Sequence, residues 1–318
     1  MKEVVAGVDI GGTNTVSGLV DRSGNIIATE KLITTDYPEI NDFISALSVS
    51  INRMLSKEKG LQLLGIGIGA PNGNYYRGTI ELAANLAWQG IIPFADLLRE
   101  KIDVPVLMTN DANAAAMGEM IFGAAKGMKD FIVLTLGTGL GSGIVINGEI
   151  VYGSTGFAGE LGHSVVVPDG RQCGCGQRGC LETYASATGL VKTALFLLSD
   201  RREDSILRGI APSELTSKKI AEAAASKDSL ALEAMDFTAE KLAAGITDAV
   251  VFSSPEAVFF FGGLARAGEM LFDPVRKYVD LKIMPIFRGT VKILPSGIPE
   301  NNAAVLGSAA LIWNKTSL

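Results

Sequence analysis

Histidine and cysteine are scarce in this chain. Its 318 residues include one histidine and three cysteines. The opening residues, MKEVVAGVDIGG, contain no basic segment followed by an apolar one, so we expect no signal peptide. Three cysteines without a leader indicate a reducing cytoplasm, where clustered thiols bind metal more often than they form disulfides.

Long apolar runs and long basic runs are also absent. No segment reaches the ~18 uninterrupted apolar residues of a membrane span, so no membrane partner is expected. The net charge is −6, which argues against nucleic acid as the main partner. With 47% hydrophobic and 19% charged residues, the composition is typical of a globular enzyme, and the length predicts two domains.

Runs rich in Val and Ile alternate with helical patterns along the chain. The runs are bounded by Gly, Pro or Asn, which is typical of strands. Strands are expected at 4–10, 15–21, 25–34, 63–71, 104–110, 130–137, 141–148, 257–263 and 291–295. Helices are expected at 39–58, 112–123, 218–226, 229–252, 268–280 and 302–313. Hairpins followed by alternating strands and helices predict an α/β fold with mixed sheets.

Two segments of the chain are similar to each other, residues 7–27 and residues 133–151. Each reads as an apolar strand, a Gly/Thr turn, a second strand, a polar turn and a third strand, and Gly11 aligns with Gly137. The similarity suggests two related domains, each opening with a glycine-rich turn. The alternative is that unrelated hairpins look alike.

Both glycine-rich turns are candidate phosphate sites, because Gly and Thr turns expose backbone N–H groups that attract anions. Asp9 ends the first strand beside the first turn, where a carboxylate either holds Mg²⁺ through water or caps the turn. A dinucleotide fingerprint at 136–143 is disfavoured, because a β-branched hairpin follows it instead of a helix. The sequence contains no Walker A motif.

The stretch TNDANAAAMGE (109–119) leaves a strand and enters an alanine-rich helix. Asp111 has two interpretations there. It is either the helix N-cap or a base that accepts the proton of a hydroxyl during phosphoryl transfer. The neighbouring residues do not decide between these roles.

All of the histidine and cysteine lies within residues 162–180. Cys173, Cys175 and Cys180 follow His163 in a glycine-rich stretch that can fold tightly around an ion. Three thiolates and one imidazole form the closed tetrahedral ligand set of a structural zinc ion. A chance meeting of buried thiols and a core histidine is the alternative, and the clustering argues against it.

Two carboxylates flank this motif, Glu160 before His163 and Glu182 after Cys180. A metal that pins the loop would hold both carboxylates near His163, whose second ring nitrogen would serve for a hydrogen bond. Such a set suits a polyol, whose hydroxyls need acceptors as well as donors. We therefore expect the metal to fix a substrate loop and other residues to carry out the reaction.

Six motifs along the chain are shared with a known family. They are DIGGT (9–13), NDANAAAMGE (110–119), LGTGLGSG (136–143), GELGH (159–163), CGCGQRGCLE (173–182) and GG (262–263). With them the chain resembles the ROK family (repressors, open reading frames and kinases) over nearly its full length, and specifically its bacterial glucokinase-like sugar kinases. In one departure, the loop GAPNGNYY has Asn72 where the family usually has glycine after the proline.

The resemblance implies an actin-like (ribonuclease H-like), duplicated two-domain ATPase fold with ATP and sugar in an interdomain cleft. The expected domains are a smaller one at 1–118 plus 303–318 and a larger one at 119–302 that carries the zinc loop. Asp111 is the implied catalytic base. The implied sugar-binding residues are Asn85, Asn110, Glu160, His163 and Glu182. The implied residues for nucleotide and Mg²⁺ are Asp9, Gly11, Gly12, Thr13, Asn14, Gly137, Thr138, Gly139, Gly262 and Gly263. The implied zinc ligands are His163, Cys173, Cys175 and Cys180.

The implied reaction is ATP- and Mg²⁺-dependent phosphorylation of a hexose, with glucose giving glucose 6-phosphate as the first expectation. Kinases for N-acetylmannosamine, N-acetylglucosamine or fructose are the alternatives, and polyphosphate stays open as a donor. A non-enzymatic sugar-responsive regulator is disfavoured, because the family's repressors carry a helix-turn-helix segment before DIGGT and only eight residues precede Asp9 here. A cytoplasmic homodimer is expected.

Overall fold

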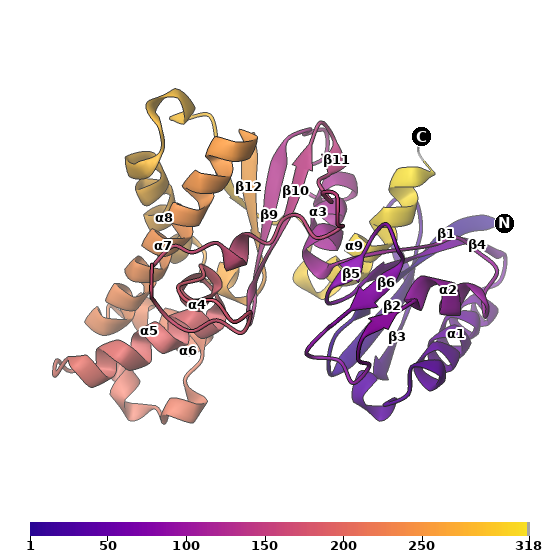
Figure 1. Cartoon of the computed structure of the whole chain (residues 1–318), viewed down its shortest axis with the longest axis horizontal. Coiled ribbons are helices and arrows are strands. Elements are labelled where there is room, and N and C mark those ends of the chain that lie inside the picture. The colour runs from indigo at the N-terminus through magenta and orange to yellow at the C-terminus, as the bar shows by residue number, and fades with distance from the viewer. Residues whose placement is uncertain (317–318) are drawn as a thin grey trace. The chain divides into compact units, whose positions relative to one another are not determined.

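Two five-stranded sheets organise the chain, one in each of two units (Figure 1). The structure is a computed structural model that describes residues 1–316, apart from the side chains of residues 300 and 301. Unit 1 comprises Met1–Met128, Ile150–Ala158 and the described residues from Ser296 onward, and unit 2 comprises Lys129–Glu149 and Gly159–Pro295. The expected domain boundaries at 118/119 and 302/303 stay a prediction.

The sheet of unit 1 has the strand order β3-β2-β1-β4-β8. These strands are β1 (Lys2–Ile10), β2 (Asn14–Val20), β3 (Ile26–Ile33), β4 (Leu61–Gly69) and β8 (Val106–Thr109). β1 pairs antiparallel with β2 and parallel with β4, and β4 pairs parallel with β8. The carboxyl ends of β1, β4 and β8 therefore meet at one edge of the sheet. A small sheet of β5 (Gly73–Asn74), β6 (Thr79–Glu81) and β7 (Ile91–Ile92) belongs to the same unit.

The sheet of unit 2 repeats this order as β11-β10-β9-β12-β13. These strands are β9 (Phe131–Leu136), β10 (Leu140–Ile146), β11 (Glu149–Ile150), β12 (Ala257–Phe261) and β13 (Lys292–Pro295). β9 pairs antiparallel with β10 and parallel with β12, and β12 pairs parallel with β13. The internal similarity that the sequence predicts is confirmed at the level of strand order, and the mixed α/β fold class is confirmed with it.

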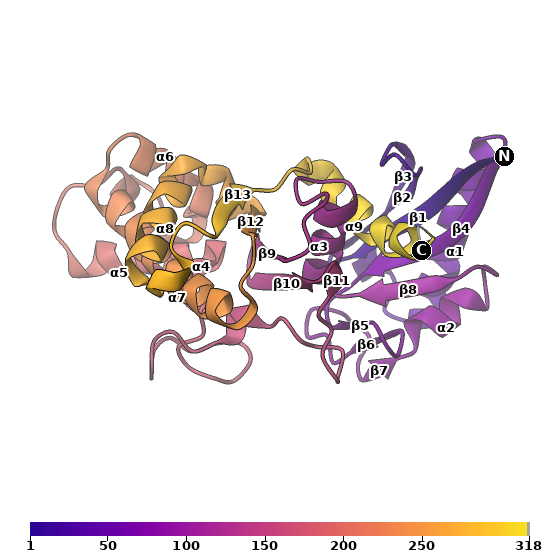
Figure 2. The same ribbon diagram turned by 90° about the horizontal axis from the view of Figure 1, so that it is seen from above.

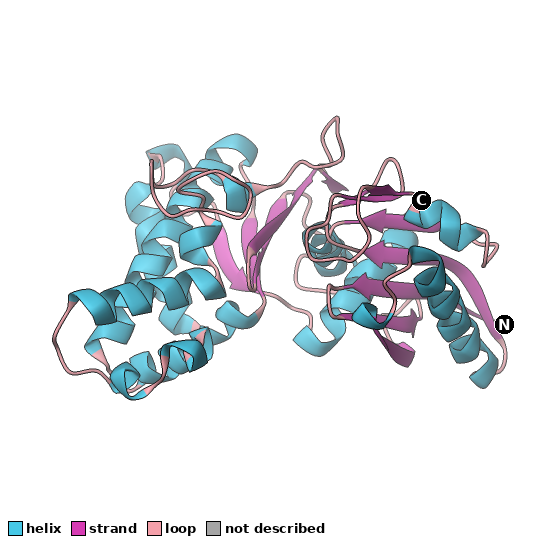
Figure 3. Cartoon of the chain, turned by 60° about the horizontal axis from the view of Figure 1, so that its bottom comes forward, coloured by secondary structure: helices cyan, strands magenta, loops and turns pink. Residues whose placement is uncertain are grey.

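Helices cover both faces of the unit 1 sheet (Figure 3). On one face, α1 (Ile40–Lys57) and α2 (Phe94–Arg99) bury their apolar side chains against strand residues such as Val4 and Val8. On the other face, α9 (Glu300–Lys315) lies directly against Gly7 and Gly67. A Cβ on either glycine would collide with a backbone carbonyl of the helix. Helix α3 (Asp111–Ile121) packs beside α9 through small residues, with Gly118 facing Gly307.

The helices of unit 2 gather beside its sheet (Figures 1 and 2). They are α4 (Glu182–Ala185), α5 (Ala187–Asp200), α6 (Ser217–Ala225), α7 (Ser229–Ser253) and α8 (Glu269–Lys282). Their core includes Leu134 and Phe260 from the sheet, Leu242 and Ile246 from α7, and Phe272 from α8. Helix α7 is apolar along most of its length because it is packed against α5, α6 and α8.

The long strands and helices expected from the sequence are all present, with ends that differ by a few residues. The short strand β11 is the third strand expected within residues 133–151, whereas the short strands β5, β6 and β7 and the helices α2, α4 and α5 were not expected. Among the described residues, no helix combines the length and the apolar character needed to cross a bilayer.

Candidate active site

The unit 1 part of the site lies at the carboxyl edge of three parallel strands. The register pairs Asp9 of β1 with Gly69 of β4, and Gly69 with Thr109 of β8. Asn110 and Asp111 follow Thr109 at the start of α3, so the topology brings them to the edge that carries Asp9. Asp9 and Asp111 are close enough to interact electrostatically.

Asn110, and not Asp111, is the N-cap of α3. Its backbone is extended, with ψ of 165°, and its Oδ1 accepts a hydrogen bond from the N–H of Asn113 at 2.7 Å. The Asp111 Oδ1 accepts from the adjacent N–H of Ala112, at 2.9 Å, and not from the N–H of Asn113 that a capping residue would bind. The capping role is thus already filled, and the Asp111 carboxylate keeps its second oxygen for another partner. The Asn110 amide keeps its Nδ2 as a donor.

The two carboxylates at this edge favour protonation more than ordinary aspartates do. Burial, and secondly the negative charge of Asp111, raise the pKa of Asp9 from 3.8 to about 6. Burial also raises the pKa of Asp111, and this outweighs the lowering effect of the Ala112 N–H. The Asp111 side chain still has solvent-accessible surface, so a substrate can reach it. The surrounding protein atoms nevertheless displace enough water from the carboxylate to raise its pKa.

The Gly11–Asn14 turn follows Asp9 and packs against the segment that carries Asn85. The N–H of Gly11 donates to the carbonyl of Asn14 at 2.9 Å. A Cβ on Gly12 would collide with the carbonyl of Asn85, so glycine is required for this close approach. Thr13 and Asn85 both expose their side chains. The structure therefore brings Asp9, the glycine turn and Asn85 together.

Asn72 replaces the glycine that the family usually has in this loop, and it keeps a glycine-like backbone. Its φ is +51°, a left-handed conformation that Asn tolerates better than most residues. Its Nδ2 donates to the carbonyl of Glu81 at 2.9 Å and to that of Leu82 at 3.3 Å. The departure in sequence thus preserves the turn and adds a tether to the segment that leads to Asn85.

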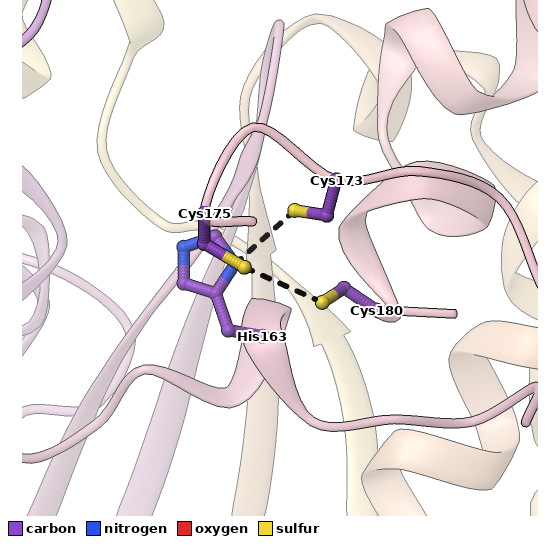
Figure 4. Close-up of side chains that lie close together, drawn as sticks. All are labelled: His163, Cys173, Cys175 and Cys180. Carbon is purple, nitrogen blue, oxygen red and sulfur yellow. Dashed lines mark hydrogen bonds between the residues drawn. The ribbon is translucent and has the colours of Figure 1, made fainter. Parts of the chain in front are cut away.

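In unit 2, the histidine and the three cysteines lie together (Figure 4). One ligand atom from each of His163, Cys173, Cys175 and Cys180 lies within 4.8 Å of all the others. The Sγ atoms of Cys175 and Cys180 are 3.7 Å apart, and the Cys173 Sγ is 3.6 Å from the His163 Nδ1. Tetrahedral zinc with Zn–S of ~2.3 Å and Zn–N of ~2.0–2.1 Å has edges of about 3.8 Å and 3.6 Å. The residues fit a zinc ion.

The chain around these ligands is held by its own turns. The N–H of Cys173 donates to the carbonyl of Gln177 at 2.9 Å, and the N–H of Gly176 to the carbonyl of Cys173 at 3.1 Å. Gly176 and Gly179 have φ of +92° and +83°, a region that L-residues rarely adopt. Cys173 and Cys180 are buried whereas Cys175 is exposed.

Glu182 connects the cysteine cluster to the second glycine-rich turn. Its Oε1 lies 3.8 Å from the Cys173 Sγ, and its Oε2 accepts the N–H of Leu140 at 3.0 Å. A Cβ on Gly139 would collide with the same carboxylate. Glu160 is exposed and immediately precedes the short helical turn Leu161–His163. The structure thus brings Glu182, His163 and Gly139 into one region of unit 2.

The turn Gly137–Gly139 lies at the carboxyl end of β9, where Gly262 and Gly263 follow the parallel strand β12. Gly262 has φ of +102°, and a Cβ there would approach the Leu136 carbonyl to 2.8 Å. The N–H of Ala187 donates to the carbonyl of Gly137 at 2.9 Å, which holds the turn at the start of α5. Both glycine turns therefore lie at the carboxyl ends of two neighbouring parallel strands, β9 and β12.

A cavity beside Gly263 was not expected from the sequence. It has a volume of about 420 Å³ and is lined by α6, by the turn Gly263–Ala267 and by Met270 of α8. This volume is in the range of small-ligand pockets. Residues such as Ser217 and Lys218 line it without belonging to any recognisable motif, so no sequence signal pointed to them.

Comparison with known proteins identifies the family. The ROK family model matches residues 5–315. This chain belongs to the ROK family. It is 36% identical to the glucokinase of Thermotoga maritima over 311 residues, covering 96% of each chain. It is 30% identical to the xylose repressor of Bacillus subtilis, covering 96% of this chain and 76% of the repressor.

A solved structure supports the same assignment. The ROK family glucokinase of Streptomyces griseus, in complex with glucose and AMPPNP, aligns with a TM-score of 0.79 and 35% identity. The alignment covers 97% of this chain and 98% of that one. The actin-like ATPase fold expected from the resemblance is confirmed by this match.

Proposed function

We propose that this chain is an ATP-dependent hexose kinase whose substrate is glucose. The observation that carries the proposal is the Asp111 carboxylate, which is accessible, is not the helix cap and lies at the same sheet edge as Asp9. Similarity to glucokinases across 96% of the chain supports the choice of reaction and sugar.

Asp111 acts as the general base. Its carboxylate takes the proton of the sugar 6-hydroxyl while that oxygen attacks the γ-phosphorus of ATP. The bond between the γ-phosphorus and its bridging oxygen breaks, and ADP leaves with the electron pair. Since burial raises the pKa of Asp111, the carboxylate is a stronger base than a solvated aspartate. Alignment of the hydroxyl supplies much of the remaining rate enhancement.

Asp9 and the glycine turns hold the metal–nucleotide complex. Among the described residues, Asp9 has neither an ion-pair partner nor a hydrogen-bond partner for its half-buried carboxylate. A hard divalent cation such as Mg²⁺ fits that carboxylate, and when bound it neutralises phosphate charge. The first turn, Gly11, Gly12, Thr13 and Asn14, and the second turn, Gly137, Thr138 and Gly139, face the phosphates. The N–H groups of Gly11 and Gly137 close these turns onto the carbonyls of Asn14 and Gly139, so the phosphate donors come from the other N–H groups of the two turns. Adenosine lies at Gly262 and Gly263, in the 420 Å³ cavity.

The cysteine cluster holds a structural zinc ion that positions the sugar-binding side chains. Zinc bound by His163 through Nδ1 leaves Nε2 for a sugar hydroxyl. Glu182 is fixed beside Cys173, and Glu160 precedes His163, so both carboxylates accept from hydroxyls. Asn85 and the Asn110 amide complete the sugar-binding set. Four ligands close the coordination shell, so the zinc takes no part in the chemistry.

A hexose panel tests the sugar assignment. A site built from hydrogen-bonding groups discriminates by up to ~10⁴ in kcat/KM against sugars that leave those groups unpaired. We expect kcat/KM for glucose to be at least tenfold above that for N-acetylmannosamine, N-acetylglucosamine and fructose, measured by coupled ADP release. A higher value for any of the three would make the glucose assignment wrong while leaving the kinase assignment standing.

A sugar-responsive regulator is the second candidate, favoured by the similarity to xylose repressors. It needs sugar binding but no turnover, so it predicts glucose binding by calorimetry without ADP release. We also propose a cytoplasmic homodimer that uses ATP in preference to polyphosphate. Sedimentation of the purified chain, cell fractionation and a donor comparison test these parts.

A further inference from the structure

A second cavity in unit 2 is not used by the proposed reaction. It has a volume of about 490 Å³ and lies between the cysteine loop, α5 and α7. Its walls are largely aromatic, with Tyr184, Phe196 and Phe237 among the lining residues. Drug-sized ligands occupy pockets of this volume and character.

Arg171 is the charged residue in the inner wall of this cavity. Its Nη1 donates to the carbonyl of Thr183 at 2.8 Å and to that of Gly189 at 3.2 Å, and its Nη2 donates to the Thr193 Oγ1 at 2.9 Å. The guanidinium carbon lies 4.5 Å from the centroid of the Tyr184 ring. The head group is therefore held in one orientation by three hydrogen bonds and an aromatic face.

This guanidinium has no carboxylate beside it. Among the described residues, no carboxylate forms an ion pair with Arg171, and the acids that line the same cavity pair with Arg201 instead. A guanidinium has five N–H groups, so three used donors leave the Nε–H and one Nη2–H. That pair of donors matches the two oxygens of a carboxylate or phosphate. A half-buried cation gains stability from such a partner.

The acidic residues at the rim do not cancel this preference. Both acids pair with Arg201 and not with Arg171. The Asp200 Oδ2 lies 3.4 Å from the Arg201 Nε, and the Glu233 Oε1 lies 3.0 Å from the Arg201 Nη2. Both carboxylates are exposed, so solvent screens them. The cavity thus carries the Arg171 guanidinium and aromatic walls, and the two acids and one arginine at its rim leave a net charge of −1 that solvent screens.

We propose that this cavity binds a small organic anion, with a carboxylate or phosphate group on Arg171 and a ring or branched apolar body between Phe196 and Phe237. The site goes beyond the proposed kinase function and shares no residue with the sugar or nucleotide sets. Its wall belongs to the segments that carry Cys173 and Glu182, which lie two residues from Arg171 and Tyr184 respectively.

Calorimetric titration of the zinc-loaded full chain tests the proposal without sugar or ATP. Phenyl phosphate and benzoate serve as the anionic probes, and benzyl alcohol is the neutral control of similar size. Both anions are expected to bind at least about tenfold more tightly than the alcohol, because a fork of charged donors favours them. The tighter of the two anions identifies the preferred acid group.

Two variants locate the binding. Arg171→Met should abolish the preference for the anions over the alcohol. Because Arg171 also anchors its loop, Phe196→Ala is the second variant. Phe196 is 60% exposed and is not among the proposed ligands of zinc or sugar, so the variant should melt like the wild type and bind both anions several-fold more weakly.

Three results would overturn the proposal. One is equal affinity for the anions and the alcohol. Another is the absence of anion binding up to ~10 mM, a limit that corresponds to very weak association. The third is wild-type anion affinity in both variants, which would place the anion elsewhere, for example on the phosphate turns. None of these results bears on whether the chain phosphorylates glucose.

Discussion

Replacing Asp111 by asparagine separates the catalytic role from a role in helix capping. Asparagine has nearly the same shape but cannot accept the hydroxyl proton. Loss of a general base typically lowers kcat by ~10²–10⁴-fold. We expect this loss in Asp111→Asn, with a glucose KM close to that of the wild type, because the Asn110 amide and the unit 2 carboxylates are unchanged.

The structure predicts almost no loss of stability in the same variant. The capping bond between the Asn110 Oδ1 and the Asn113 N–H, 2.7 Å long, is retained, so the ~0.5–2 kcal/mol cost of losing a cap does not apply. Removing an acid from the first turn costs ~0.3–1 kcal/mol. Burial raises the folded-state pKa of Asp111, so its ionised form destabilises the fold at neutral pH, and removing the charge offsets that cost.

Asp42→Asn is the matched control, since Asp42 is an exposed acid in the first turn of α1. It should change neither kcat nor, by more than ~1 kcal/mol, the free energy of unfolding. Coupled ADP release gives kcat and KM, and urea unfolding gives stability. A kcat for Asp111→Asn within tenfold of the wild-type value, or a stability loss like that of a missing cap, would refute the reasoning.

Three further substitutions test other parts of the account. Asp9→Asn should abolish most turnover, yet without nucleotide it should raise the free energy of unfolding at pH 7 by up to ~3 kcal/mol. The wild type loses stability as pH rises from about 4 to about 6 through the raised pKa of Asp9, so the gain should vanish near pH 4. Cys175→Ser should reduce the zinc content below one ion per chain in elemental analysis, and it should raise the glucose KM at least as much as the ATP KM. A full zinc content in this variant would contradict the ligand assignment. Asn72→Gly should keep the left-handed turn but lose both side-chain hydrogen bonds to the segment leading to Asn85. We expect the glucose KM to rise up to ~10-fold at unchanged kcat. Kinetics identical to those of the wild type would show that the tether has no role in sugar binding.

The sequence predicted the parts of the site that depend on strand ends and ligand chemistry. Asp9 lies near the end of β1 and Asp111 follows β8, and both strands pair in parallel with β4, so any sheet with this order brings the two residues to one edge. The Cys and His residues offer soft ligands that no other part of the chain has, and their clustering in space matches their clustering in sequence. The functional roles of these residues stay predictions.

Other features depend on backbone geometry and packing that the sequence does not specify. Asn110 and Asp111 are adjacent, and the extended backbone of Asn110 together with its bond from the Asn113 N–H identifies it as the cap. The sequence shows Asn72 only as a departure from the family's glycine, and its φ of +51° shows that the left-handed backbone is kept. The cavities beside Gly263 and Arg171 arise where helices far apart in sequence pack together, so no local pattern reveals them.

Phosphorus NMR of the purified wild-type chain with glucose, ATP and Mg²⁺ tests the central claim most directly. The account predicts that the γ-phosphoryl signal of ATP is replaced by that of glucose 6-phosphate, with one ADP formed for each sugar phosphorylated. Repeating the reaction with Asp111→Asn at the same protein concentration should leave the ATP signals nearly intact. A wild-type chain that binds glucose and ATP but forms no sugar phosphate would contradict the account, and so would a variant that forms it at the wild-type rate.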